Sequence, residues 1–317
     1  CAARQKEIFL DYSKMKLNWK SFALLCIVNL AFCIGSIAQV DPLVKTEWSQ
    51  RSPYNNLCPT DSKYKETTLA GCVAIAMAQV MNYWQWPAHG IGKNSYRWTD
   101  ANNKSKTLSA NFGDTYYRWE DMESDPVAVS TFVYHCGVAV YMDYSTGFSG
   151  SSEYYAKSAL ETNFGYSEDI QMRPRNLYTD EQWAALLKDN LDKGWPIIYS
   201  SGVHTYVVDG YNSEGLFHNN QGYGWGGYWW TIDQMGDKVS STAIINIHPD
   251  YSSKAKVEEP TFVVFTTDGK SAAYPTAQID EMLWTTTDLK VTKKDETTKT
   301  TKLNKLSYVK QLFPTEN

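Results

Sequence analysis

The chain has 317 residues, which is long enough for a large hydrophobic core with an active-site cleft. Its formal net charge at pH 7 is -5, so it lacks the basic surplus of nucleic-acid-binding proteins, and we expect no nucleic-acid partner. Its 22 Tyr and 12 Trp suit a protein that grips polymers outside the cytoplasm.

The N-terminal region has the pattern of a secretory signal peptide. Residues 15–38 start with basic residues, continue through the apolar stretch SFALLCIVNLAFCIGSIA and end in the small residues Ser36 and Ala38. Met15 is a natural initiator, so residues 1–14 are interpreted as upstream sequence from a misplaced start. A membrane anchor is the competing interpretation, which the short apolar run disfavours. We expect a protein that is secreted, periplasmic or at the cell surface, with no membrane contact after signal cleavage.

The cysteine count then becomes informative. Removal of the signal peptide leaves Cys58, Cys72 and Cys136, an odd number. In an oxidising compartment an unpaired thiol is either prone to unwanted pairing or serves as a reactive group. A Cys58–Cys136 pair would leave Cys72 free, and the sequence leaves that pairing open.

Residues 39–250 are expected to form one globular domain with a helical first half. Apolar residues at helical spacing predict helices over residues 71–83, 126–142 and 152–164. A further helix is predicted after Thr179, because Thr179 and Gln182 form a capping box ahead of the apolar run WAALLKDNL.

The second half of this domain is predicted to be β-structure. The short runs WPIIYS, HTYVVDGY, GLFHN, GYWWTI and STAIINI are separated by Gly, Asn and Ser. Helices followed by strands indicate an α+β protein with two lobes. Residues 251–317 form a C-terminal extension in which PTFVVFTTDG predicts one strand and turn, and the Thr- and Lys-rich remainder is expected to be solvated and partly disordered.

Cys72 is the first candidate for chemistry. Gly71 interrupts the chain just before it, and the predicted helix runs onward from it. Unpaired N–H groups at a helix N-terminus favour a thiolate, so Cys72 is a candidate nucleophile. The competing interpretation is a small core residue packed among alanines.

A thiolate catalyst needs an imidazole that holds it and later donates a proton to the leaving group. His204 opens a predicted strand after a loop and lies 132 residues after Cys72, a separation typical of papain-like enzymes. The other four histidines are less well placed, and for His135, in mid-helix, a core or surface role is the default.

A third group should orient the imidazole. Asn220 lies sixteen residues after His204, across a predicted hairpin that would bring the two side by side. The neighbouring Asn219 remains an alternative.

Together these segments resemble the streptopain family of secreted, papain-like cysteine peptidases. The matching motifs are LAGCVAIAMAQVMNYW around Cys72, VHTYVVDGY around His204 and HNNQGYGWGG around Asn220. Upstream, PLVKTEWSQRSPYNNLCP is similar to the start of that family's mature domain. The resemblance covers roughly residues 40–250, and several ordered motifs matching together are more specific than any one alone.

The resemblance implies a papain-like two-lobed fold, with a helical lobe and an antiparallel β lobe. It assigns Cys72 as nucleophile, His204 as base, Asn220 as the orienting amide and Gln50 as a side-chain donor to the oxyanion hole. The alternative for Gln50 is an ordinary polar loop residue. Phe148 and Val203 fall near the family's substrate-contacting positions, and either could equally serve ordinary packing.

The sequence departs from the family at two tryptophan positions, which are here Gln221 and Tyr223. A tryptophan there would shield the hydrogen bond between asparagine and histidine from water, so the departure bears on catalytic efficiency. Trp225 would take over that role if the glycine-rich loop were shifted by two residues.

The sequence thus predicts a secreted cysteine endopeptidase that acts on protein or peptide substrates, without cofactor or metal. Hydrolysis is expected to proceed through a thiolate–imidazolium pair of Cys72 and His204 and a thioacyl intermediate. The resemblance suggests a pocket for an apolar side chain one position before the residue that donates the scissile carbonyl. Family members usually carry an inhibitory pro-segment, which is not evident here, so a separate proteinaceous inhibitor is a possible partner. The alternatives are a catalytically weak homologue that acts as a binding or decoy protein, and another acyl-transfer enzyme such as an amidase or transglutaminase.

Overall fold

The computed structural model describes residues 39–314, and residues 39–317 group into one compact unit. The interpretations of residues 1–14 and of the signal peptide at 15–38 therefore lie outside the described residues. Within the described part of the chain, none of the helices has the length and apolar character needed to cross a membrane.

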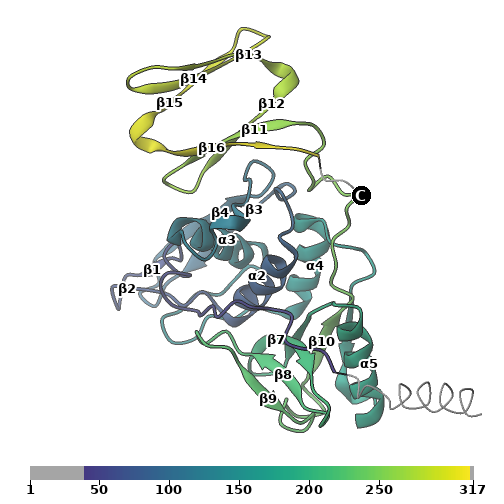
Figure 1. Cartoon of the computed structure of the whole chain (residues 1–317). Coiled ribbons are helices and arrows are strands. Elements are labelled where there is room, and N and C mark those ends of the chain that lie inside the picture. The colour runs from purple at the N-terminus through teal and green to yellow at the C-terminus, as the bar shows by residue number, and fades with distance from the viewer. Residues whose placement is uncertain (1–38, 315–317) are drawn as a thin grey trace, which may run out of the picture. The chain divides into compact units, whose positions relative to one another are not determined.

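Four α-helices occupy the predicted positions (Figure 1): α2 (Cys72–Trp84), α3 (Pro126–Ala139), α4 (Glu153–Phe164) and α5 (Asp180–Asp192). Their starts follow local chemistry, since the Asp125 and Ser152 side chains cap α3 and α4 by accepting backbone N–H bonds. The predicted capping box is confirmed, because Thr179 and Gln182 satisfy each other's backbone N–H groups at the start of α5.

The central sheet is antiparallel and follows the order β5-β10-β6-β7-β8-β9. Its strands are β5 (Gln171–Pro174), β6 (Ile197–Ser200), β7 (Thr205–Tyr211), β8 (Phe217–Asn220), β9 (Tyr228–Trp230) and β10 (Thr242–Ile245). Every residue of β6, β7 and β8 is buried. Helices followed by an antiparallel sheet confirm the predicted α+β class.

The sheet is buried because each face packs against helices. On one face Ile198, Val207 and Ile244 join the core that surrounds α2, α3 and α4. On the other face Tyr199 and Val208 pack with Trp183 and Leu187 of α5. Neighbouring residues therefore point to opposite layers, as strand geometry requires, and α2 lies directly against β7.

Short hairpins complete the main domain, which we define as residues 39–250. The first pairs β1 (Thr60–Asp61) with β2 (Glu66–Thr67), and the second pairs β3 (Lys93–Thr99) with β4 (Ser105–Asn111). Single 3-10 turns lie at η2 (Trp119–Asp121) and η3 (Arg175–Leu177).

The chain continues into a second structured part, the C-terminal β region (residues 261–312). One three-stranded sheet contains β11 (Thr261–Thr266), β12 (Ser271–Pro275) and β16 (Leu306–Leu312). The other contains β13 (Ile279–Trp284), β14 (Asp288–Lys293) and β15 (Thr298–Lys302), and 3-10 turns η4 (Thr276–Gln278) and η5 (Leu303–Lys305) connect the two sheets. Where the sequence led us to expect a solvated and partly disordered extension, the structure has six strands. One small cluster of buried residues holds these sheets together and comprises Val264, Tyr274, Leu289 and Val291.

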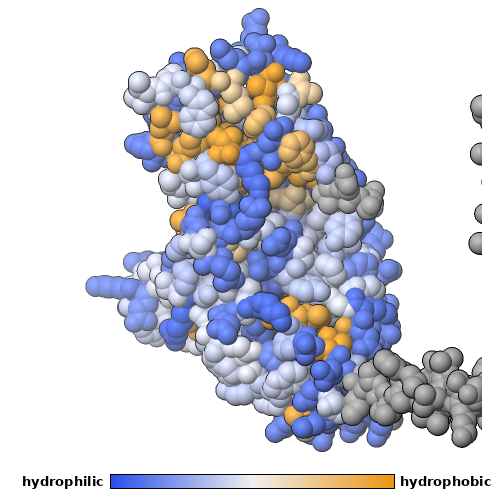
Figure 2. All heavy atoms as spheres, viewed as in Figure 1, coloured by the Kyte–Doolittle hydropathy of each residue, from blue (hydrophilic) through white to orange (hydrophobic). Residues whose placement is uncertain are grey.

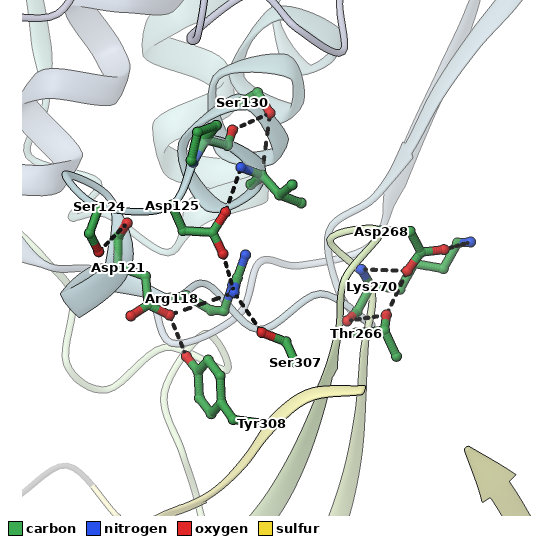
Figure 3. Close-up of polar contacts among 12 residues, drawn as sticks. Arg118, Asp121, Ser124, Asp125, Ser130, Thr266, Asp268, Lys270, Ser307 and Tyr308 are labelled. Carbon is green, nitrogen blue, oxygen red and sulfur yellow. Dashed lines mark hydrogen bonds and ion pairs between the residues drawn. The ribbon is translucent and has the colours of Figure 1, made fainter. Parts of the chain in front are cut away.

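Arg118 joins the C-terminal β region to the main domain (Figure 3). Its guanidinium Nη1 lies 2.7 Å from Asp125 Oδ2 and 3.4 Å from Ser307 Oγ of β16. Tyr308, also on β16, donates its hydroxyl to Asp121 Oδ2 at 2.7 Å. On the face that Figure 2 shows, hydrophobic residues gather over the C-terminal strands, whereas the surface over the main domain is mostly hydrophilic.

Candidate active site

Cys72 is the first residue of α2 and is only 7% exposed. Gly71 before it adopts a φ of 92°, a conformation that L side chains rarely adopt, and a Cβ there would lie 2.5 Å from Met142 Sδ. Glycine is therefore required for the sharp turn that delivers Cys72 to the start of the helix. Thr205 is the polar neighbour whose backbone N–H and hydroxyl act on the pKa of the Cys72 thiol.

The surroundings of Cys72 favour the neutral thiol. Burial is the largest effect and raises the pKa of the Cys72 thiol, and the negative charge of Glu153 raises it further. Hydrogen bonds from Thr205 and from the Val73 N–H act in the opposite direction and lower the pKa of Cys72 without reversing the net rise. The stabilisation expected from the helix N-terminus is present at Val73 but is outweighed.

His204 lies directly before β7, so its neighbour Thr205 links it to Cys72. The imidazole Nε2 is 2.9 Å from the backbone oxygen of Gln221. A carbonyl oxygen can only accept, so Nε2 carries the proton and Nδ1 is the basic nitrogen. Burial lowers the pKa of His204, and the Gln221 carbonyl partly opposes that change. Burial thus acts against the charged form of each group.

The hydrogen bonds of the Asn220 side chain lead to partners other than His204. Its Nδ2 donates to the Thr46 backbone oxygen at 2.7 Å, and its Oδ1 accepts from Gln79 Nε2 and from the Gly222 N–H. The side chain thus faces α2, which contains Gln79, and the orienting bond to His204 comes from the next residue, Gln221.

The alternative residue, Asn219, does not orient the imidazole either. Its Nδ2 donates to the backbone oxygen of Phe217 at 2.7 Å. Both asparagines are fully buried and secure strand β8 and the turn after it. Only the backbone register, which sequence spacing does not reveal, decides which group at the end of β8 meets the imidazole.

Tyr223 covers the His204 imidazole, which is the role expected of the tryptophans that this sequence lacks. Its ring stacks on the His204 imidazole, with centroids 4.9 Å apart and an angle of 12° between planes. Trp225 instead packs edge-on against Tyr228, so the proposed two-residue shift of the loop is not observed. The aromatic character of Tyr223 was the sequence signal that could have identified this residue.

Gln50 is brought close to the nucleophile by its backbone. Its carbonyl accepts the Ala70 N–H at 2.9 Å, two residues before Cys72. The preceding Ser49 forms a β-bridge with Tyr223. Gln50 therefore lies between the segment that holds Cys72 and the loop that covers His204, a position suited to a donor for the oxyanion.

The two candidate substrate-binding residues are both exposed. Val203, which is 82% exposed, lines a cavity of ≈ 520 Å³ together with His204 and Tyr223. Phe148 is 65% exposed and precedes Ser149, whose hydroxyl donates to the Leu69 carbonyl beside the Cys72 turn. Val203 thus lies beside His204, and Phe148 lies in the segment that bonds to the chain just before Cys72.

Among residues 39–314, the other two thiols and the histidines at 135 and 218 lie in structural environments. Cys58 and Cys136 are buried, free thiols, so the pairing left open above is not observed. His135 is buried against the Tyr117 hydroxyl, and burial lowers its pKa to about 4. His218 Nδ1 lies 2.6 Å from Asp209 Oδ1 in the core. Among residues 39–314, no cluster of His, Cys, Asp or Glu is arranged to hold a metal ion.

Comparison with known proteins gives consistent relatives. Streptopain of Streptococcus pyogenes is 31% identical over 226 residues, which cover 61% of this chain and 56% of streptopain. The thiol protease/hemagglutinin PrtT of Porphyromonas gingivalis is 30% identical over 200 residues, covering 59% of this chain and 22% of PrtT. The chain thus spans about half the length of the streptopain that it matches.

Solved structures agree with the sequence relatives. The active interpain A cysteine protease of Prevotella intermedia superposes with a TM-score of 0.58 at 33% identity, covering 66% of this chain and 94% of interpain A. A prointerpain A fragment from the same organism gives a TM-score of 0.60 at 29% identity, covering 74% of this chain and 84% of the fragment. The fold is therefore that of papain-like cysteine peptidases. A family model described as the Peptidase C10 family matches residues 48–229, more than half of the chain, and the chain belongs to that family.

Proposed function

We propose that this chain is a cysteine endopeptidase in which Cys72 attacks the peptide carbonyl and His204 transfers protons. One observation carries the proposal: α2, which begins at Cys72, packs against β7, which begins directly after His204, and His204 Nε2 is held by the Gln221 backbone oxygen. His204 Nδ1 is then the basic nitrogen, on the residue that directly precedes the strand packed against the Cys72 helix. Membership of a peptidase family supports the same reading.

In the proposed mechanism, the Cys72 proton passes to His204 Nδ1 as sulfur bonds to the carbonyl carbon. The Cys72 backbone N–H and the Gln50 amide donate to the resulting oxyanion. The C–N bond breaks as His204 protonates the leaving amine. Water then adds to the thioester with His204 as base, and collapse releases the acid and restores the thiol.

We expect protein or peptide substrates with an apolar side chain one position before the residue that donates the scissile carbonyl, next to Phe148 or Val203. Asn220 has no direct part in this mechanism, because its polar atoms bond to Thr46, Gln79 and Gly222. No cofactor is required by these steps. Action outside the cytoplasm, and control by a separate protein inhibitor, belong to the same proposal.

The decoy alternative depended on the two lost tryptophans. Stacking of Tyr223 on His204 argues against it, because the imidazole retains an aromatic cover. The amidase or transglutaminase alternative shares the nucleophile and differs only in the acceptor and the leaving group.

The deciding experiment measures new N-termini released from casein by the purified chain and by its Cys72→Ala variant. We expect release by the parent chain only, with a Cys58→Ala variant, which alters a different buried thiol, behaving like the parent. Equal release by the parent and Cys72→Ala would refute the assignment. Ammonia release or amine incorporation without new N-termini would favour the other acyl-transfer chemistry.

A further inference from the structure

A glutamine on the helix that begins at Cys72 bonds to two other segments of the main domain. Gln79 lies about two turns along α2 and is fully buried. Its Oε1 accepts the Thr46 hydroxyl at 2.9 Å and the Trp48 backbone N–H at 3.4 Å. Its Nε2 donates to Asn220 Oδ1 at 3.3 Å, at the end of β8. One side chain thus joins α2 to the N-terminal segment of the domain and to β8.

Asn220 completes the connection between these segments. Its Nδ2 donates to the Thr46 backbone oxygen at 2.7 Å, and its Oδ1 also accepts the Gly222 N–H at 3.1 Å. Thr46 is 5% exposed, Gln79 0% and Asn220 1%. These three residues form a buried polar network, in which each side chain bonds to at least one of the others.

The backbone partners determine which way each amide of the network points. A backbone N–H can only donate and a backbone carbonyl oxygen can only accept. The Trp48 N–H therefore requires the oxygen of Gln79, and the Thr46 carbonyl requires the nitrogen of Asn220. Reversing either amide would place like atoms opposite each other. The network consequently has one arrangement of donors and acceptors, which fixes the three segments more specifically than apolar packing would.

The turn after β8 packs directly on α2 beside the network. Gly222 has a φ of 68°, and a Cβ there would lie 2.8 Å from Ile75 Cγ2 of the helix. The turn begins with Gln221, whose backbone oxygen lies 2.9 Å from His204 Nε2. A displacement of this turn would therefore move the group that holds the imidazole.

The N-terminal segment carries the candidate oxyanion donor. Gln50 lies two residues after Trp48, whose N–H bonds to Gln79. Between them, Ser49 forms a β-bridge with Tyr223, the residue that covers the imidazole. The nucleophile, the imidazole and the oxyanion donor thus come from segments that all bond to one side chain.

We propose that Gln79 is a positioning residue, which fixes the turn that contains Gln221 and the segment that contains Gln50 relative to the helix that begins at Cys72. The inference deepens the proposed function and rests on it for its catalytic meaning. The three catalytic groups act on one carbonyl, and a misplacement of about 1 Å in any of them lowers the rate of the chemical step. Gln79 contacts no reacting atom and acts only through the segments that it joins.

Two measurements on Gln79→Met test this role, since methionine has a similar size but has no N–H to donate and accepts only weakly. Cleavage of a peptide substrate should show kcat about tenfold lower, with KM within about twofold of the parent value. An NMR titration of the His204 imidazole in the full chain should show a midpoint at lower pH, because the Gln221 carbonyl raises the pKa of His204 in the parent. A His204→Gln spectrum identifies the signal among the five histidines.

Asn190→Leu is the matched control. Asn190 is also a buried amide with both ends bonded, to the Leu186 oxygen and the Asn246 N–H, but it lies on α5. Denaturant unfolding should show a similar loss of stability in the two variants, whereas kcat and the His204 midpoint should change only in Gln79→Met.

Parent values of kcat and of the His204 midpoint in Gln79→Met would overturn the proposal. A lower kcat without a shifted midpoint, or an equal fall in Asn190→Leu, would assign the loss to general destabilisation and overturn it equally. If Gln79→Met does not fold, Thr46→Val, which removes one hydroxyl from the network, should lower kcat about threefold and move the midpoint in the same direction. Unchanged values in folded Thr46→Val would then reject the role of Gln79.

The NMR titration separates this inference from the proposed function, because it requires no turnover. A shifted His204 midpoint in Gln79→Met, for a chain that releases no N-termini from casein, would support the positioning role and reject the peptidase. Casein cleavage by the parent, with kcat and midpoint unchanged in Gln79→Met, would do the reverse.

Discussion

The main domain and the C-terminal β region use strands in opposite ways. All seven residues of β7 are buried, and helices cover both faces of its sheet. In β15, four of five residues are exposed, and the buried cluster shared by the C-terminal strands has four members. The first arrangement fixes polar groups such as Thr205 in one geometry, whereas the second tolerates change. Substitutions in the main domain should therefore disturb chemistry, and those in the C-terminal β region should mainly affect local stability.

The largest effect is expected at Gly71. In Gly71→Ala, the new Cβ would lie 2.5 Å from the Met142 side chain in a backbone conformation unfavourable to alanine, so we expect a loss of about 3 kcal/mol in unfolding free energy. Denaturant unfolding measures this loss, and casein cleavage should fall with it. Gly215→Ala is the matched control, because it also has a positive φ but open space around its Cβ, and it should cost about 1 kcal/mol. Equal losses in the two variants would show that backbone strain, and not the contact with Met142, sets the cost of Gly71→Ala.

The sequence anticipated the elements whose side-chain pattern is one-sided and whose ends are capped, such as α5 with Thr179. The sequence also led us to expect that Cys72 and His204 lie on elements that meet, and α2 does pack against β7. It did not anticipate that Gln221, and not Asn220, meets the imidazole, because a register shift between Val208 and Gly210 alters the pairing of β7 with β8.

The C-terminal strands after β11 were missed for a different reason. Their Thr and Lys residues are partly or fully exposed, so the run resembles solvated sequence by composition. Threonine is nevertheless a good strand former, and alternation around Leu289 and Val291 was the available signal. Hydrophobic patterning predicts strands well only where burial is extensive.

The next effect concerns acid stability of the main domain. Burial lowers the pKa of His135 to about 4, below its value in the unfolded chain, so the unfolded state binds more protons as pH falls. Stability contributed by neutral His135 is present above about pH 6.5 and is lost progressively down to about pH 4, by about 3 kcal/mol in total.

Unfolding of the parent and of His135→Gln as a function of pH measures this effect. The variant keeps an acceptor for the Tyr117 hydroxyl but cannot take up the proton. We expect a flatter pH dependence in the variant between about pH 6.5 and 4. Parallel curves for the two proteins would assign acid sensitivity to other groups, including those of the C-terminal β region.

A smaller effect is expected at the junction of the two regions. Arg118→Met removes a buried guanidinium from Asp125 and Ser307 and should cost about 2 kcal/mol, because Asp125 loses its partner. Lys310→Met breaks the exposed pair with Glu120, which also spans the junction, and should cost less than about 1 kcal/mol. Thermal unfolding measures both, and the Cys72 alkylation rate should stay at the parent value. A changed alkylation rate in Arg118→Met would mean that the junction is coupled to the active site.

The smallest effect on stability, and the sharpest test of the comparison, is at Tyr223. This residue is 54% exposed, like many in the C-terminal β region, yet it stacks on His204. Tyr223→Leu should leave the unfolding free energy nearly unchanged while lowering kcat/KM for a peptide substrate about fivefold, the equivalent of about 1 kcal/mol of aromatic contact. Because burial lowers the pKa of His204, uncovering the ring should raise that pKa and move the acidic limb of the pH profile to higher pH. Tyr223→Trp should retain the parent profile. If Tyr223→Leu matched the parent in both rate and pH profile, exposed residues would be equally replaceable in the main domain and in the C-terminal β region. The two regions would then differ only in how many of their residues are buried.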